Sequence, residues 1–337
     1  MASVREIARL VGVSPATVTR AMNNHPTVAA DVRQRVIEAV NRAGYVSAVG
    51  KRSTDNIAFL YTGGSSLGSP YDAAVMQGMT DGMDDLGCDL LILCAGRALE
   101  TGETFTQMFH RKGVRGAVIR TDQRTRHLAE AIADEGFPAV VVADRFEHAR
   151  VSFIDCDSRA TSREAVEHLI VLGHERIGIC LNTAEDTDHR DRLAGYRAAL
   201  EAAGIAFDER FVYREVARLD GGAQLIRKMR AGRDVPTAIY VADPLSAVGA
   251  INEAQRHGMR VPDDLSVVGF DDGELRFVTH PRLTAVVQDA REVGREAVEV
   301  LDRLMSAPDR ARPERRVLPT RFELHETTAA PPSRATA

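Results

Sequence analysis

Seven charged or aromatic side chains could bind a small polar ligand, because most of them stand at or near the ends of apolar runs. Asp144, Asp243 and Asp271 each directly follow such a run, and Arg120 ends another. Carboxylates accept hydrogen bonds from hydroxyl groups and a guanidinium donates in a planar fork, which suits a ligand rich in hydroxyls. The candidate ligand-binding residues are Tyr71, Asp72, Arg120, Asp144, Arg192, Asp243 and Asp271. Taken singly, each could equally be a loop residue or part of a surface ion pair.

The motifs that would carry catalysis are incomplete in this sequence. The run GGSSLGS at 63–69 has the glycine spacing of a P-loop, but it continues with Pro70 and lacks the Lys and Ser/Thr that hold phosphate and Mg²⁺. His189-Arg190-Asp191 resembles a kinase catalytic loop without its Asn or its Gly-rich partner. His, Cys and acidic residues nowhere have metal-site spacing. We therefore expect no enzyme, no cofactor and no metal ion.

The elements that position the candidate ligand residues form a repeating pattern from residue 57 onward. Apolar, β-rich runs span 57–62, 89–94, 116–120, 139–143, 176–181, 237–242 and 265–270, and helices are expected at 73–86, 160–172, 190–203 and 245–257. Continuous apolar strands separated by amphipathic helices predict doubly wound parallel sheets. About 280 residues suit an α/β body of two such lobes, in which ligands bind beyond the carboxyl ends of the strands.

The first 45 residues predict a small all-α head instead. Residues 3–12 have helical apolar spacing that ends at Gly12, and Ser14-Pro15 is a strong start for a second helix over 15–24. A third helix is expected over 31–43. Two short helices joined by a tight Gly-containing turn form a helix-turn-helix. The alternative for this pattern is a three-helix bundle that binds protein.

In a helix-turn-helix the second helix enters the DNA major groove by its N-terminal end. There Arg20 can make a bidentate contact to guanine, whereas Thr17, Thr19, Asn23 and Arg33 suit phosphates, which position the protein without specifying sequence. The candidate DNA-binding residues are Ser14, Pro15, Ala16, Thr17, Thr19, Arg20, Asn23, Arg33 and Val49.

The charge distribution supports this division of the 337 residues. The net charge of −5 argues at face value against nucleic-acid binding. Residues 1–56, however, carry eight Lys/Arg against four Asp/Glu, a net +4, which leaves −9 on the remainder. A basic head on an acidic body favours a nucleic-acid module joined to something else. With no membrane span, no signal peptide and no paired cysteine spacing, we expect a cytoplasmic protein with free thiols.

The head resembles the helix-turn-helix of LacI/GalR-type transcriptional regulators in the run AxLxGVSxATVxRxxN at 8–23 and in VxxxxRxRVxEAxxxxGY at 28–45. The body is similar to that family in GHERIG, RLAGYRAALEAAGI, VPDDLSVVGFDD and HPRLTAVVQ, at 173–178, 192–205, 261–272 and 280–288. The resemblance implies a periplasmic-binding-protein-like sensor whose two lobes close around a small effector. The chain would cross between the lobes near 156–161 and near Gln288, and Asp144, Arg192 and Asp271 match effector-binding positions.

Three departures from the family pattern affect what the resemblance implies. A hinge Leu that opens the central minor-groove step is replaced by Gly50, so weaker bending of DNA is expected unless Val49 substitutes. The usual Asn-Asp becomes Asp243-Pro244, and a carboxylate accepts but does not donate. Because the chain has no Trp, the aromatic platform common in sugar sites would have to be Tyr71 or Phe270.

The resemblance and the residues together predict a ligand-responsive repressor that binds a pseudo-palindromic double-stranded DNA operator as a homodimer. The expected organisation is a DNA-binding domain at 1–45, a hinge at 46–56, an effector-binding and dimerisation body at 57–326 and a disordered tail at 327–337. Lobe one would comprise about 57–156 and 289–318, and lobe two about 161–287. A sugar-like inducer is expected, with a corepressor as the alternative. The rival class is a solute-binding or sugar-metabolising protein on the same body.

Overall fold

The computed structural model describes residues 4–22, 25, 27–42, 56–62, 67–183, 186–232, 234–306 and 312–332. The chain divides into two compact units, Met1–Thr54 and Asp55–Ala337. Within the described ranges, no helix combines the length and the apolar character needed to cross a lipid bilayer.

The described residues of the first unit form three short helices, α1 (Val4–Val11), α2 (Pro15–Met22) and α3 (Ala30–Arg42). Their apolar faces form one small core that includes Ile7, Val18 and Val36, all fully buried. Gly12 ends α1 in the left-handed region at φ 75°, where a residue without Cβ is favoured. The predicted helix-turn-helix head is thereby confirmed.

The first lobe of the second unit is built on a parallel sheet with the strand order β11-β5-β4-β3-β1-β2. The strands are β1 (Asn56–Tyr61), β2 (Asp89–Cys94), β3 (Val114–Arg120), β4 (Ala139–Val142), β5 (Ser152–Asp157) and β11 (Arg315–Pro319). Alternate side chains of the strands enter two cores, one on each face of the sheet. One face is covered by α4 (Pro70–Met83) and α12 (Ala290–Ser306), and the other by α6 (Phe105–Lys112) and α7 (Arg126–Asp134).

The second lobe repeats this plan with the order β12-β10-β9-β8-β6-β7. Its strands are β6 (Ile177–Asn182), β7 (Val212–Glu215), β8 (Ala238–Val241), β9 (Ser266–Asp271), β10 (Thr284–Val287) and β12 (Arg321–Glu323), the last antiparallel to β10. The pair α8 (Arg159–Val171) and α9 (Thr187–Ala202) covers one face, and α10 (Leu219–Ala231) and α11 (Pro244–Arg256) cover the other. The predicted body of two doubly wound lobes is confirmed.

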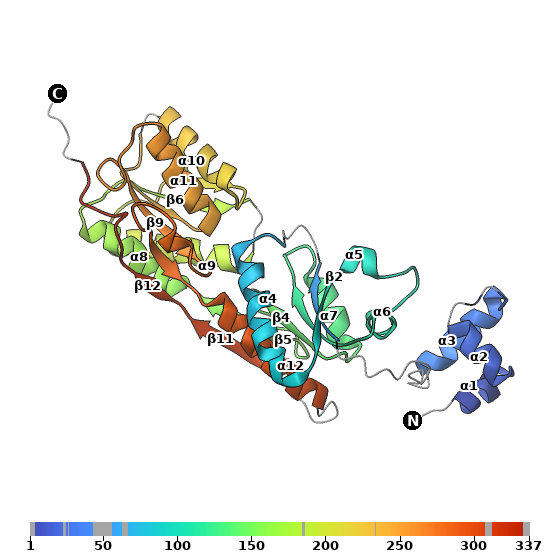
Figure 1. Ribbon diagram of the computed structural model, residues 1–337. Helices are drawn as coiled ribbons and strands as arrows, with labels where there is room; N and C mark the ends of the chain where they lie inside the picture. Colours follow the sequence, from blue (N-terminus) through green and yellow to red (C-terminus); the bar gives the residue numbers. More distant parts are fainter. Residues whose placement is uncertain are drawn as a thin grey trace. The chain divides into compact units, whose positions relative to one another are not determined.

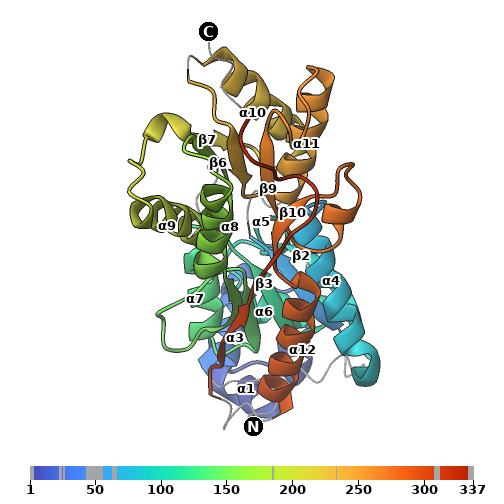
Figure 2. The ribbon, with the colours of Figure 1, turned by 90° about the vertical axis from the view of Figure 1, so that its left-hand side faces the viewer.

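Three segments connect the lobes, one more than the sequence predicted. The chain passes from β5 to α8, from β10 to α12 and from β11 to β12, and the last crossing was not foreseen (Figures 1 and 2). The first and third crossings are joined by a hydrogen bond, because the hydroxyl oxygens of Thr161 and Thr320 lie 2.7 Å apart.

The first residues of the expected tail pack on the second lobe. Thr327 is fully buried, and its hydroxyl donates to the carbonyl of Val267 at 2.6 Å and accepts from the amide of Thr284 at 2.9 Å. The carbonyl of Ala329 lies 2.9 Å from Nε2 of the buried His174. The expectation of disorder is therefore wrong for 327–332, which pack on the second lobe, and 333–337 lie outside the described residues.

Helices α4 and α12 pack backbone to backbone, which two glycines make possible (Figures 1 and 2). A Cβ built on Gly78 would stand 1.8 Å from the carbonyl oxygen of Arg291, and one on Gly294 would stand 2.0 Å from that of Val75. Such approaches fix the separation of the two helices that cover one face of the first sheet.

Gly78→Ala is therefore expected to destabilise the body by about 2–3 kcal/mol, since the methyl group overpacks a rigid backbone contact. Gly96→Ala is the matched control, because a Cβ there meets no atom within 4 Å. Urea unfolding followed by circular dichroism measures both. Equal unfolding midpoints for the two variants would contradict the packing account.

Candidate functional site

Three candidate residues of the first lobe lie together at the carboxyl end of its sheet. Ser69 caps α4 by accepting the amide of Asp72 at 3.0 Å, which places Tyr71 and Asp72 in the first helical turn. Arg120 ends β3, its Nε lies 3.3 Å from Oδ1 of Asp72, and its guanidinium stands 5.1 Å from the centroid of the Tyr71 ring. Burial raises the pKa of Tyr71 well above its ordinary value despite the nearby Arg120. This corner therefore holds a paired charge and a neutral phenol.

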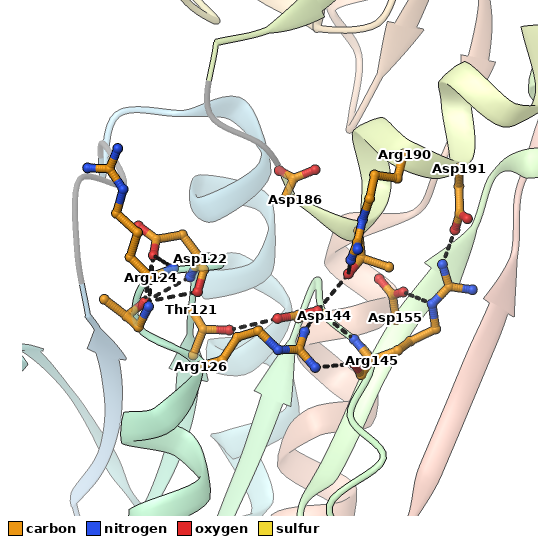
Figure 3. Close-up of polar contacts among 12 residues, drawn as sticks. Thr121, Asp122, Arg124, Arg126, Asp144, Arg145, Asp155, Asp186, Arg190 and Asp191 are labelled. Carbon is orange, nitrogen blue, oxygen red and sulfur yellow. Dashed lines mark hydrogen bonds and ion pairs between the residues drawn. The ribbon is translucent and has the colours of Figure 1, made fainter.

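Asp144 follows β4 and joins both lobes. The preceding Ala143 has φ 58°, a left-handed conformation that is strained for a residue with a Cβ. The buried carboxylate of Asp144 pairs with Arg126 and accepts from Thr121 Oγ1 at 3.3 Å, while Thr187 Oγ1 donates to it from the second lobe at 2.7 Å. Figure 3 shows Arg126 and Arg145 on either side of Asp144.

Arg145 makes the second connection between the lobes, and sequence reasoning did not identify it. Its Nε lies 3.0 Å from Oδ2 of Asp155 in its own lobe, and its Nη2 pairs with Asp191 in α9 (Figure 3). Arg159 also pairs with Asp191, at 2.8 Å.

Beside this cluster lies an open, charged pocket of about 640 Å³ between the lobes, lined by residues that include Arg126, Arg145, Arg159, Arg190, Glu130 and Asp191.

Arg192 lies in the second turn of α9, since the helix begins at Thr187 and not at 190 as expected. Its guanidinium stacks 3.6 Å above the centroid of the Phe270 ring, and Nη1 donates to the carbonyl of Ala242 at 2.6 Å. Phe270 is fully buried beneath it, so Tyr71 is the aromatic platform that remains of the two proposed.

Asp243 faces a buried histidine at the N-terminal ends of two helices. Nδ1 of His189 lies 2.7 Å from Oδ1 of Asp186, and its Nε2 lies 3.3 Å from Oδ2 of Asp243. Burial opposes the charge of the imidazolium, but the attraction of Asp243 and Asp186 outweighs burial and raises the pKa of His189 to about 10. One cation is thus shared by two carboxylates at neutral pH.

Asp271 stabilises a turn, and its neighbour Asp272 interacts electrostatically with Arg192. The fully buried carboxylate of Asp271 accepts the backbone amides of Gly273, Leu275 and Arg276, each at 3.2 Å, and Nη1 of Arg276 at 2.7 Å. Asp272 accepts Gln288 Nε2 at 2.6 Å, and burial raises its pKa to about 7 although Arg192 lowers it.

Sequence reasoning therefore missed several charged residues of the cleft: Arg145, Asp155, Asp188, His189 and Asp272. Two signals could have found some of them. Asp188 precedes Arg192 by four positions, which places both on one helical face, and Asp272 completes the acidic doublet after β9.

In the head, the turn before α2 is fixed by its own side chains. Ser14 Oγ accepts the amide of Thr17 at 3.1 Å, as an N-cap does, and Thr19 Oγ1 donates to the carbonyl of Pro15 at 3.1 Å. Pro15, Ala16 and Arg20 are exposed on α2.

Arg33 is partly engaged within the head. Its Nη2 donates to the carbonyls of His25 and Val28, each at 3.1 Å, so it holds the segment between α2 and α3. The other two candidates, Asn23 and Val49, lie outside the described residues.

Comparison with known proteins finds both parts of this arrangement. Residues 3–47 match the family model of bacterial regulatory proteins of the lacI family, and 166–328 match that of a periplasmic binding protein-like domain. The HTH-type transcriptional repressor PurR of Vibrio campbellii is 30% identical over 307 residues, which cover 89% of this chain and 91% of that repressor. The chain belongs to the LacI family of bacterial regulatory proteins.

Solved structures of LacI-family members are similar over nearly the whole chain. A transcriptional regulator CelR in complex with cellobiose is 26% identical with a TM-score of 0.69, covering 97% of this chain and all of that one. A lac repressor dimer bound to operator and an anti-inducer is 26% identical with a TM-score of 0.67, covering 98% and 99%.

The variant His189→Gln removes the imidazolium that Asp186 and Asp243 share, and it should change how the free energy of unfolding depends on pH. Because the folded pKa of about 10 lies above the unfolded value of about 6.5, the stabilisation by the imidazolium is complete below pH 6.5 and is lost as pH rises from 6.5 to 10. The difference in unfolding free energy between wild type and variant should shrink by about 3–5 kcal/mol over that window. Chemical unfolding at a series of pH values measures it, and parallel profiles for the two proteins would contradict the assignment.

Proposed function

We propose that this LacI-family member is a repressor whose affinity for operator DNA is controlled by a small polar metabolite bound between the lobes. The observation that carries the proposal is the buried set of carboxylates and guanidiniums that meets between two lobes, in a chain that also has a helix-turn-helix head. In this proposal 1–45 bind DNA, 46–56 form the hinge, and 57–326 bind the effector and dimerise.

Several findings support a DNA partner and a dimer. A helix-turn-helix presents one short helix to the major groove, and one such module buries too little surface for tight, specific binding. Two heads related by a two-fold axis would read a pseudo-palindromic site. The similar lac repressor structure is a dimer on its operator, which supports the same arrangement here.

The polar character of the cleft supports a hydroxylated effector. Asp72, Asp243 and Asp272 provide acceptors for hydroxyl groups, Arg120 and Arg192 provide donors, and Tyr71 provides an aromatic surface. The similar CelR structure contains cellobiose, which supports a sugar or sugar derivative. Among the described residues, no cluster of three or more His, Cys, Asp or Glu could hold a metal ion.

Coupling between ligand and DNA would act through contacts that cross the cleft. The pairs Thr187–Asp144 and Arg145–Asp191 hold one arrangement of the lobes. An effector can shift the protein toward another arrangement only by the difference between its affinities for the two.

An electrophoretic mobility shift assay with genomic fragments near the protein's own gene tests the proposal. A sequence-selective, salt-sensitive shift that metabolites alter is expected. A solute-binding or sugar-metabolising protein would give no selective shift under any condition, and that result would sink the proposal.

Arg20→Ala is expected to weaken binding to the cognate operator by about 1–3 kcal/mol and to relax the preference at one base pair. The reason is that Arg20 is exposed on α2, the helix that would enter the major groove. Fluorescence anisotropy with the operator and with single-base variants measures the effect. An equal loss on every sequence would reassign Arg20 to a phosphate.

Arg192→Ala is expected to abolish the effector response while operator affinity stays within a few fold of wild type. Arg192 lies in the cleft, on a different unit from the head, and Arg192→Lys is the companion variant that keeps the charge but loses the planar fork. Calorimetry with the effector measures binding. Unchanged ligand affinity in Arg192→Ala would contradict this role.

A further inference from the structure

The cleft between the lobes contains more carboxylates than cations. Two pairs are matched, Asp144 with Arg126 and Asp191 with Arg159. One connected set of interacting side chains, which excludes Arg190 and Glu130 of the pocket lining, has two more carboxylates than cations. Its carboxylates are Asp72, Asp155, Asp186, Asp188, Asp243 and Asp272, and its cations are Arg120, Arg145, His189 and Arg192. Buried charge of one sign is costly unless a partner compensates it.

Asp188 is the least satisfied of these carboxylates. It stands in the first turn of α9 with 7% of its surface exposed, and its Oδ1 is buried without a hydrogen-bond partner. The distance from its Oδ2 to Nη2 of Arg192, 3.7 Å, is too long for a hydrogen bond. One oxygen of Asp188 therefore lacks a hydrogen-bond donor among the described residues.

The charge of Asp188 acts on groups of the other lobe. Burial and, after it, Asp188 raise the pKa of Asp155 to about 8. Asp188 also contributes to the raised pKa values of Tyr71 and Arg120. Its own pKa is raised by burial and by Asp186, against the lowering effects of Arg192, Arg120 and His189. Asp188 thus lies where the groups of both lobes meet.

A second unsatisfied group beside Asp188 is a donor. Nε of Arg192 is buried without a hydrogen-bond partner, and only 4% of this residue is exposed. The guanidinium stacks on the ring of Phe270, which fixes its plane. An orphaned acceptor and an orphaned donor four positions apart on one helix can bind two adjacent groups of one ligand.

We infer that the effector carries a protonated amine next to a hydroxyl or ring oxygen, as an amino sugar does, with the amine on Asp188 and the oxygen at Nε of Arg192. This inference rests on the proposed function, because it assigns a chemical class to the ligand of the same cleft. A neutral sugar would bring no positive charge to these carboxylates, so Asp155, Asp188 and Asp272 would keep the protons that their raised pKa values favour. A cationic ligand would pair with the ionised forms instead.

Calorimetry on the full chain with matched ligands tests the inference. The probes are glucosamine, galactosamine and mannosamine, each compared with its parent hexose and its N-acetyl derivative, at pH 6.5 in two buffers of different ionisation enthalpy. At least one amine is expected to bind at least about tenfold more tightly than its neutral counterparts. Its binding should release protons, because a cation lowers the pKa of Asp188, Asp155 and Asp272.

Asp188→Asn is the decisive variant, since it removes the charge and keeps the shape. The preference for the amine and the proton release should both disappear, while thermal unfolding shows that the variant folds. Asp220→Asn is the matched control, because Asp220 is an exposed acid in the first turn of α10 and its loss should change neither quantity.

Equal affinity for amine and parent sugar, failure of all three amines, or a preference that survives Asp188→Asn would each overturn the inference. A response to Mg²⁺ equal to that of the amine would also overturn it in favour of a metal ion. If the protein still selects an operator in these cases, the proposed function stands without the amine. If it selects no operator, the proposed function itself fails.

Discussion

Two adjacent residues at the end of β4 hold the lobes together through buried charge. Asp144 accepts a hydrogen bond from Thr187, and Arg145 pairs with Asp191, so both contacts reach α9 of the second lobe. Loss of one partner from a buried ion pair costs about 3–5 kcal/mol when the other charge is left unpaired. The cost is smaller here, because Asp191 keeps Arg159 and Arg145 keeps Asp155. The arrangement of the lobes therefore depends on which charges in the cleft are compensated, and a ligand that changes the compensation can change the arrangement.

The rest of the body makes this cleft stiff. Glycine contacts such as Gly78 on Arg291 fix helix separations within a lobe, and the connection at Thr161 and Thr320 ties two of the three crossings together. Rigid lobes that meet through a few polar contacts suit a hinge motion better than a continuous deformation. A ligand that is small compared with the protein can thus produce a response of the whole body.

Much of the fold could be predicted from the sequence because apolar runs report burial directly. The strands β1, β3, β4, β8 and β9 have such runs, but β11 and β12 are short and charged, and they become strands only by pairing with β5 and β10 far away along the chain. The site was harder, because spacing shows where an acid stands and not what it pairs with. Asp271 and Asp272 are neighbours in sequence, yet one caps a turn and the other belongs to the cleft.

In the proposed regulator, ligand binding between the lobes and operator binding by the head share one free energy of coupling. The most direct measurement is the affinity for operator with and without saturating effector, together with the affinity for effector with and without operator. Linkage requires that both ratios show the same factor, about 5–150-fold for typical coupling. An effector that binds the free protein and the operator complex with equal affinity would contradict the account.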